Sequence, residues 1–243
     1  NRLFLNKGDL KFEDISESAG IKGNKPWSTG VVMADINNDG FLDIYVSNAG
    51  NMEGNNHDND LYINNGDGTF TEKAHEYNLA ETGFSTHASF FDYDKDGDTD
   101  LFLATLGKQM LFQNRLVPDG ELYFLDVSEQ AGISVQSYGM SSAAADVNRD
   151  GWPDIYVANM YSKAGERIVD NLRRGIYSDD VDAQMRDFVG GNELYRGLGA
   201  GKFDRIGQST GVADVGWAYG PGFVDLDNDG WLDLYAPVGF QSV

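Results

Sequence analysis

Five aspartates stand at alternate positions between residues 92 and 100, and Gly97 interrupts them at position six. Carboxylates this close repel one another strongly unless a cation lies among them. Calcium ions are bound by loops with side-chain oxygens at positions 1, 3 and 5 and a backbone carbonyl at position 7, and a glycine at position 6 makes the sharp turn. These residues therefore predict a calcium loop.

Three more segments repeat this pattern, with aspartate at positions 1, 5 and 9, aspartate or asparagine at position 3 and glycine at position 6. In chain order they are loop one (residues 35–43), loop two (92–100), loop three (146–154) and loop four (225–233). Loops one and three carry Asn37 and Asn148 at position 3 and so have one fewer charge than the other two. We expect them to bind Ca²⁺ more weakly.

The composition fits a cation-binding protein. The formal net charge is −21 and the pI is about 4.2, so nucleic-acid backbones and anionic membrane surfaces would be repelled. Four divalent ions would cancel eight of the 21 net negative charges. There is no cysteine to form a disulfide, and no apolar run reaches the length of a membrane-spanning helix. We therefore expect about four Ca²⁺ ions, no nucleic-acid partner and no membrane insertion.

The loops imply strands on either side. A small apolar stretch precedes each loop and an alternating apolar stretch follows it, which predicts a hairpin. A second hairpin unit begins at Asn1, Asn59, Gln109 and Asn192 and reads Asn-x-Leu-Tyr or a close variant. Two hairpins make a four-stranded antiparallel sheet, and repeats of this length indicate β-propeller blades. The predicted fold is an all-β propeller in one domain, residues 1–243.

Two features complete the predicted architecture. The chain starts with the second hairpin of a blade and finishes with the first hairpin of another, so pairing of the two would close a ring of four blades. We expect this closure because it leaves no unpaired sheet edge, the alternative being part of a larger ring. The interval from loop three to loop four is the longest, which places an insertion with one or two short helices at residues 161–190. It contains Arg167, Arg173, Arg174 and Arg186.

The alternating hairpins and loops resemble those of the FG-GAP/VCBS repeat proteins, whose blades also build the integrin alpha-subunit head. The resemblance is strongest to the cartilage acidic protein and ASPIC-type branch, in which the Asn-x-Leu-Tyr hairpin, a Ser-x-x-Ala-Gly-Ile tail and the aspartate loop follow one another. Gln109 replaces the expected asparagine, and residues 115–121 replace a compact turn, so that blade departs from the pattern.

The resemblance implies that each ion is held by side chains at positions 1, 3, 5 and 9 and the carbonyl at position 7. The predicted metal ligands are Asp35, Asn37, Asp39, Phe41 and Asp43; Asp92, Asp94, Asp96, Asp98 and Asp100; Asp146, Asn148, Asp150, Trp152 and Asp154; Asp225, Asp227, Asp229, Trp231 and Asp233. Position 12 is apolar in every copy, which excludes EF-hands. The expected role of the ions is structural.

Catalysis has little support in the sequence. His57, His75 and His87 are scattered, and no nucleophile elbow, phosphate loop or zinc-type histidine cluster occurs. An aromatic residue stands eight positions before each loop, and we expect these four rings to pack between blades rather than to form a platform for sugars.

The predicted function is that of a protein-binding, adhesion or scaffold module, not an enzyme. The predicted location is secreted, on the cell surface or periplasmic, because cytosolic calcium is too dilute to fill weak loops. The expected partner is a protein or glycan bound at a propeller face or at residues 161–190. A lectin-like or polysaccharide-active propeller and a structural subunit of a larger extracellular assembly remain alternatives.

Overall fold

Three complete four-stranded antiparallel blades form the centre of the molecule. The structure is a computed structural model that describes residues 1–23, 25–50, 57–161, 163–173 and 175–240. Blade one contains β3 (Ser28–Ala34), β4 (Asp43–Asn48), β5 (Asp60–Asn64) and β6 (Phe70–Glu72). Blade two contains β7 (Ser85–Phe91), β8 (Asp100–Lys108), β9 (Met110–Asn114) and β10 (Phe124–Asp126). Blade three contains β11 (Gln136–Ala145), β12 (Asp154–Asn159), β13 (Glu193–Gly199) and β14 (Lys202–Arg205).

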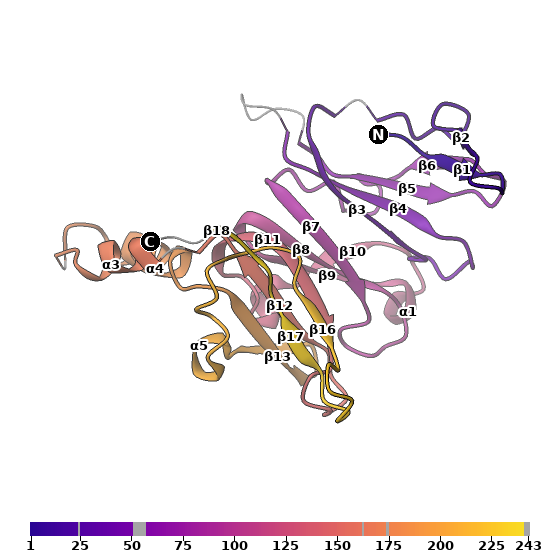
Figure 1. Cartoon of the computed structure of the whole chain (residues 1–243). Helices are drawn as coiled ribbons and strands as arrows, with labels where there is room; N and C mark the ends of the chain where they lie inside the picture. The colour runs from indigo at the N-terminus through magenta and orange to yellow at the C-terminus, as the bar shows by residue number, and fades with distance from the viewer. Residues whose placement is uncertain (24, 51–56, 162, 174, 241–243) are drawn as a thin grey trace.

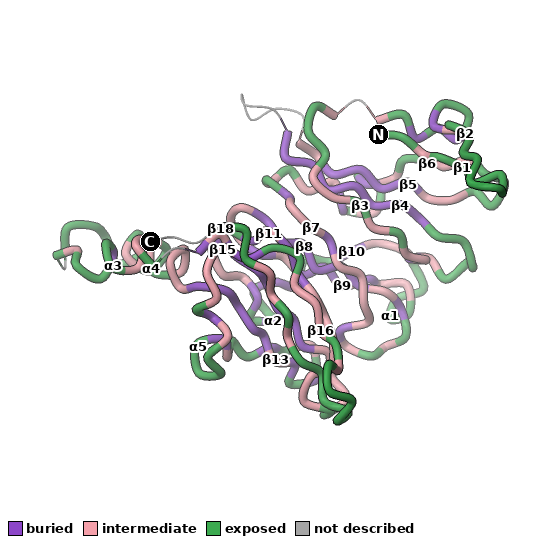
Figure 2. Tube along the Cα trace, viewed as in Figure 1, coloured by how far each residue is buried: buried purple, intermediate pink, exposed green. Residues whose placement is uncertain are grey.

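This arrangement confirms the predicted all-β propeller architecture. Each aspartate loop joins the first and second strands of a blade, as the alternation of hairpins predicts. The second strands of the three complete blades are almost wholly buried, because neighbouring blades cover both faces of each sheet (Figure 2). Tyr45, Phe102 and Tyr156 lie in these strands and are at most 1% exposed. The core is thus a series of layers between successive sheets.

Two-stranded sheets lie at the two ends of this series. At one end, β1 (Phe4–Asn6) pairs with β2 (Phe12–Asp14). At the other, β16 (Gly222–Val224) pairs with β17 (Asp233–Tyr235), and β15 (Trp217–Ala218) pairs with β18 (Val238–Phe240).

The prediction that the terminal hairpins pair to close a four-bladed ring is wrong. Among the described strands, β1 pairs with β2 alone and β17 with β16 alone. Figure 1 shows the β1–β2 sheet at the upper right and the β16–β17 hairpin at the lower centre, in front of blade three. The turn between blades is set by packing of the first strands, β3 on β7 and β7 on β11. With this packing the fourth hairpin does not reach the first, so the described blades form an open arc.

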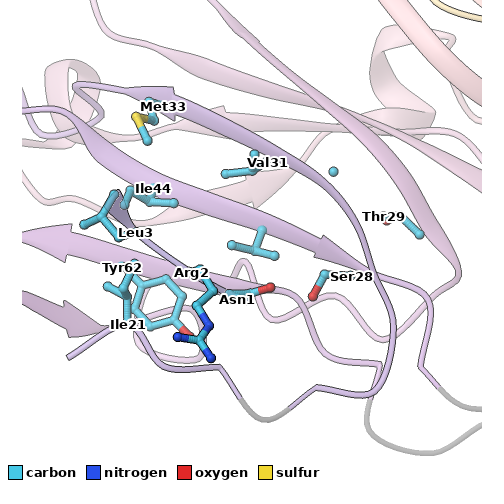
Figure 3. A pocket seen from close by; sticks show the side chains of 12 residues that line it. Asn1, Arg2, Leu3, Ile21, Ser28, Thr29, Val31, Met33, Ile44 and Tyr62 are labelled. Atoms are coloured by element: carbon cyan, nitrogen blue, oxygen red, sulfur yellow. The ribbon is translucent and has the colours of Figure 1, made fainter. Parts of the chain in front are cut away.

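A cavity of about 340 Å³ marks the end of the arc beside β1 (Figure 3). Most of its lining side chains are apolar, and they come from the segment before β1 and from β3 and β4, among them Leu3, Val31 and Ile44. Val31 is 66% exposed, whereas Ala88, at the same position of β7, is 6% exposed and packs in the core. The cavity lies where the next first strand of a propeller would pack.

Short helices occupy the connections. The Ser-x-x-Ala-Gly-Ile tails form one-turn helices such as α2 (Ser128–Ala131) and α5 (Gly207–Thr210). Gly132 ends α2 with a φ of 81°, and a Cβ there would lie 3.0 Å from the carbonyl oxygen of Phe203 in the next blade. Glycine is therefore required both for the left-handed backbone and for the close approach. These tails link successive blades.

The insertion is helical, as predicted. It contains α3 (Lys163–Asp170) and α4 (Asp179–Phe188), which extend from the side of the arc in Figure 1. Outside the insertion, the short helix α1 (Leu116–Asp119) forms the turn between β9 and β10, where the repeat pattern is irregular.

Candidate metal centre

The aspartate at position 9 connects each loop to its blade. Its Oδ2 accepts a hydrogen bond from the backbone N–H at position 2 of the same loop, at 3.0–3.2 Å in all four loops. In the three complete blades its Oδ1 accepts a second one, from the third strand, at 2.8–2.9 Å. Asp43, Asp100 and Asp154 are at most 1% exposed. This carboxylate thus fixes the loop against two strands.

Loop two has the most complete set of free ligand atoms. Oxygens of Asp92, Asp94 and Asp100 lie within 4.8 Å of one another. One carboxylate oxygen each of Asp92, Asp94, Asp96 and Asp98 is buried without a hydrogen-bond donor. Buried acceptors of this kind are costly unless a cation or donor satisfies them. Hard oxygen ligands in an irregular loop suit Ca²⁺, so the residues present fit that ion.

The electrostatics of loop two also favour a cation. Burial, assisted by the neighbouring carboxylates, raises the pKa of Asp100 to about 8, although two backbone N–H groups oppose the shift. Burial likewise raises the pKa of Asp98 to about 6. A divalent ion among these groups would stabilise their charged forms and lower both pKa values.

Residues outside loop two hold its side chains in place. The Gln113 side-chain amide donates to Asp94 Oδ2 at 2.5 Å, and the Val117 N–H of α1 donates to Asp98 Oδ2 at 2.8 Å. Reasoning from the sequence did not find these two residues. The irregular sequence at residues 115–121 could have indicated the contact of Val117, because this segment forms α1, whose Val117 N–H reaches loop two.

Loop four has a more exposed version of the same site. Oxygens of Asp225, Asp227 and Asp229 lie within 4.8 Å of one another, and Asp225 Oδ1 is buried without a donor. The Gly230 N–H donates to Asp225 Oδ2 at 2.9 Å, and the Trp231 N–H donates to Asp229 Oδ1 at 2.8 Å. Its ligand set also fits Ca²⁺.

Loops one and three are arranged differently because asparagine replaces aspartate at position 3. The Asn37 side-chain amide donates to Asp39 Oδ2 at 2.8 Å, and Asn148 donates to Asp150 Oδ2 at the same distance. Backbone N–H groups satisfy the facing oxygens of Asp35 and Asp146. The asparagine therefore supplies a hydrogen-bond donor where a cation would otherwise act.

Position 7 is an aromatic residue in loops one, three and four, and its carbonyl remains a predicted ligand, whereas in loop two it is Asp98, whose carboxylate joins the cluster. Phe41 and Trp231 are 47% and 49% exposed. The Lys95 ammonium lies 6.0 Å from the centre of the Trp152 ring, and the Arg149 guanidinium lies 4.5 Å from that of Trp231. Each of these contacts joins one loop to the next.

The aromatic rings eight positions before the loops do not all pack between blades. Trp27, Phe84 and Tyr138 are 61%, 42% and 41% exposed, so that expectation is wrong for these three. They lie at or just before the start of the first strands, at the opposite end from the aspartate loops, where neighbouring sheets do not fully cover them. Trp217 is half-buried, and its ring stacks on Tyr219 with 6.4 Å between centroids.

The three histidines lie in separate places. His57 contacts the Phe84 ring edge to face, with 5.7 Å between centroids. His75 Nε2 lies 3.8 Å from an Asp58 oxygen, and His87 Nδ1 lies 3.2 Å from Ser142 Oγ. Their separation offers no shared acid–base centre.

The contacts that attach the insertion to blade three include a stacked aromatic pair and an ionic network. Phe188 of α4 stacks on Tyr138 with ring centroids 4.5 Å apart. Arg205 of β14 donates to Asp187 of α4 at 3.0 Å and also pairs with the buried Glu193. Burial raises the pKa of Glu193, and the Arg205 guanidinium opposes that shift.

The outer side of the insertion is exposed. Ile168, Ile176 and Tyr177 are 65%, 56% and 49% exposed. Arg186 pairs with Asp182 at 2.8 Å and with Asp170 at 3.2 Å. Arg167 and Arg173 are exposed, and Arg174 lies outside the described residues.

Comparison with known proteins identifies the repeat. A family model for the FG-GAP-like repeat matches residues 1–46, 49–103, 92–157 and 180–236. Cartilage acidic protein 1 of Xenopus tropicalis is 29% identical over 187 residues, which cover 72% of this chain and 27% of that protein. The human protein of that name is 25% identical over 174 residues, covering 68% and 25%. The chain thus spans about a quarter of these relatives' length.

A solved structure with a related outline is that of an Agrocybe aegerita lectin, described as recognising non-reducing terminal N-acetylglucosamine. It aligns with a TM-score of 0.46 and 16% identity over 96% of this chain and 54% of the lectin. In the described part of the chain no helix has the length and apolar character needed to span a membrane.

Proposed function

Because this chain belongs to the family of proteins built from FG-GAP-like repeats, we propose that it is a calcium-stabilised propeller module that binds a protein partner. The setting we propose is extracellular, at the cell surface or in the periplasm, where millimolar calcium can fill weak loops. The proposal involves no reaction step. Cartilage acidic protein 1 is similar over the repeats, which supports a non-catalytic role.

Calcium would act as a structural ligand in this account. Loops two and four would hold the ion first, through the carboxylates that lack donors, and loops one and three more weakly. Bound Ca²⁺ would neutralise the converging carboxylates. An ion would also fix the loop conformation. The position 9 aspartates would in turn hold the strands, since they already connect each loop to its blade.

The partner surface that we propose is the outer side of the insertion. The observation that carries this proposal is the exposure of Ile168, Ile176 and Tyr177 in a segment that also exposes Arg167, which forms no ion pair among the described residues, in a chain of net charge −21. Apolar side chains with a basic residue at their edge suit an interface with an acidic protein. The repeat itself does not require these residues.

The test compares partner capture by three proteins. Ile168→Asp combined with Ile176→Asp changes the insertion, whereas Leu10→Asp changes a residue that is 91% exposed on the β1–β2 turn. Wild type and the Leu10 variant should crosslink to the same extracellular protein in the presence of calcium, and the insertion variant should lose it at an unchanged melting temperature. Retention of that partner by the insertion variant would refute this surface.

Glycan binding is the second candidate, and the exposed rings of Trp27 and Phe84 favour it, whereas Phe188 already stacks on Tyr138. Aromatic faces at equivalent positions of successive blades can stack on sugar rings. Binding of wild type to a glycan array, abolished by Trp27→Ala with Phe84→Ala but not by the insertion variant, would support this function over the first. Turnover of an acidic polysaccharide would instead indicate an enzyme.

A further inference from the structure

Loops three and four contact each other through side chains that the calcium pattern itself does not need. Arg149 stands at position 4 of loop three, and Trp231 stands at position 7 of loop four. The Arg149 guanidinium carbon lies 4.5 Å from the centre of the Trp231 ring, within the range of a cation–π interaction. No salt bridge of Arg149 occurs among the described residues, so the ring is its main partner.

Arg149 also covers the neighbouring glycine. A Cβ built on Gly230 would collide with the Arg149 guanidinium, so the cation lies directly against positions 6 and 7 of loop four. Gly230 has a φ of 87° and tolerates this approach because it has no side chain. Arg149 therefore packs on the backbone turn between Gly230 and Trp231.

The covered turn belongs to the candidate metal site. The Gly230 N–H donates to Asp225 Oδ2 and the Trp231 N–H donates to Asp229 Oδ1, so this turn orients two of the three clustered carboxylates. The carbonyl of Trp231 is also a predicted ligand. A contact that restricts the Trp231 ring consequently restricts both the carbonyl and the carboxylates.

Arg149 is in turn fixed by loop three. It has a φ of 60°, a left-handed conformation that is unusual for a residue with a side chain. The adjacent Asp150 N–H donates to Asp146 Oδ1 at 3.1 Å and to Asn148 Oδ1 at 2.9 Å. These oxygens are predicted ligands of loop three, so an ion bound there would hold the backbone at Arg149.

We propose that Arg149 is a positioning residue for the calcium site of loop four, and that calcium in loop three thereby favours calcium in loop four. This inference rests on the proposed calcium role. Lys95 and Trp152 form the same contact between loops two and three at the longer distance of 6.0 Å, and the coupling there is weaker. Loops one and two lack the contact, because position 4 is Asn38 and position 7 is Asp98.

The experiment is a calcium titration of the full chain that is monitored by NMR. The backbone amides of Gly40, Gly97, Gly151 and Gly230 report the four loops separately. Arg149→Asn keeps a residue that tolerates the left-handed backbone, as Asn38 and Asn228 do in loops one and four. It should weaken calcium binding at Gly230 about threefold, the size expected of an exposed cation–π contact, and leave the midpoint at Gly97 unchanged.

Three further variants separate positioning from a general structural effect. Trp231→Leu keeps the carbonyl but removes the ring, and it should weaken loop four as much as Arg149→Asn does. The double variant should be no weaker than either single variant, since both remove one interaction. Arg149→Lys should restore part of the affinity. Additive losses in the double variant would overturn the proposal.

Disabling one loop at a time tests the coupling. Asp150→Asn in loop three should weaken loop four by a similar factor, whereas Asp39→Asn in loop one should leave loop two unchanged. If calcium moves none of the four glycine amides, the proposed calcium role itself fails. If all four move but Arg149→Asn leaves loop four unchanged or tightens it, through loss of charge repulsion, only the coupling is refuted.

Discussion

At the scale of single residues, the side chain at position 3 separates two kinds of loop. Asn37 donates a hydrogen bond to Asp39, so loop one has an internal donor for its carboxylates. Asp94 provides no donor, and its neighbours in loop two retain buried oxygens without partners. Whether the side chain at position 3 ends in an amide nitrogen or a carboxylate oxygen thus decides whether the loop carboxylates have hydrogen-bond donors without an ion. This explains in structural terms why the sequence predicts weaker binding by loops one and three.

The same residue scale gives a pH dependence. Burial raises the pKa of Asp100 from 3.8 to about 8 in the calcium-free fold, so the folded state binds this proton more tightly than the unfolded state. The free energy of unfolding of calcium-free protein should therefore fall as the pH rises from about 3.8 to about 8. Saturating calcium should remove this loss, because the ion then neutralises the site.

The measurement is the melting temperature across that pH range, for chelator-treated protein with and without added calcium. Asp100→Asn is the control, since it keeps the size of the side chain and removes the titrating group. The wild-type melting temperature should fall relative to that of the control as the pH rises. A wild-type curve that rises relative to the control would show that the sign is wrong.

At the scale of elements, the residue just before each third strand caps the second strand of the same blade. Asn59 Oδ1 accepts from the Asn48 N–H at 2.7 Å, and Asn192 Oδ1 accepts from the Asn159 N–H at 2.7 Å. In blade two Gln109 has this role, because its Oε1 accepts from the Thr105 N–H at 3.2 Å. The longer glutamine side chain reaches across the tight connection between β8 and β9. Gln109, although it departs from the asparagine of the repeat, therefore keeps the hydrogen bond to the second strand.

Gln109→Ala should therefore destabilise the fold. Gln109 is fully buried, and its amide nitrogen also donates to Ser137 Oγ at 2.9 Å, so truncation leaves buried groups without partners. We expect a loss of about 2–3 kcal/mol in the free energy of unfolding, measured by denaturant titration. The exposed Gln130→Ala should change it by less than about 0.5 kcal/mol. Equal effects of the two substitutions would contradict the capping role.

Local patterns predicted the elements well and the contacts between them poorly. The aspartate spacing correctly placed the strands on both sides of each loop, because the turn chemistry is contained in nine residues. Exposure of Trp27 and Tyr138 depends instead on how far the next blade extends. The contact of Arg149 with Trp231 depends on the angle between two blades, which no short segment encodes.

At the scale of the whole molecule, the blades form an open arc with loops at one end and exposed aromatic rings at the other. The expectation of a closed four-bladed ring followed from counting hairpins, but closure depends on the rotation between blades. That rotation comes from packing of β3, β7 and β11, which the sequence pattern does not reveal. On the proposed function, the acidic loops stabilise the blades through calcium, and the helical insertion binds the partner.

The most direct test of this account is the melting temperature with and without calcium. At a calcium concentration a hundredfold above Kd, each filled site adds about 2.7 kcal/mol, which corresponds to roughly 5–10 °C for a chain of this size. We predict a rise of at least this order in calcium over a chelator, a much smaller rise in magnesium, and a rise reduced by about one site's contribution in a variant with Asp94→Asn and Asp96→Asn in loop two. An identical melting temperature in calcium and chelator would contradict the central claim that calcium stabilises these blades.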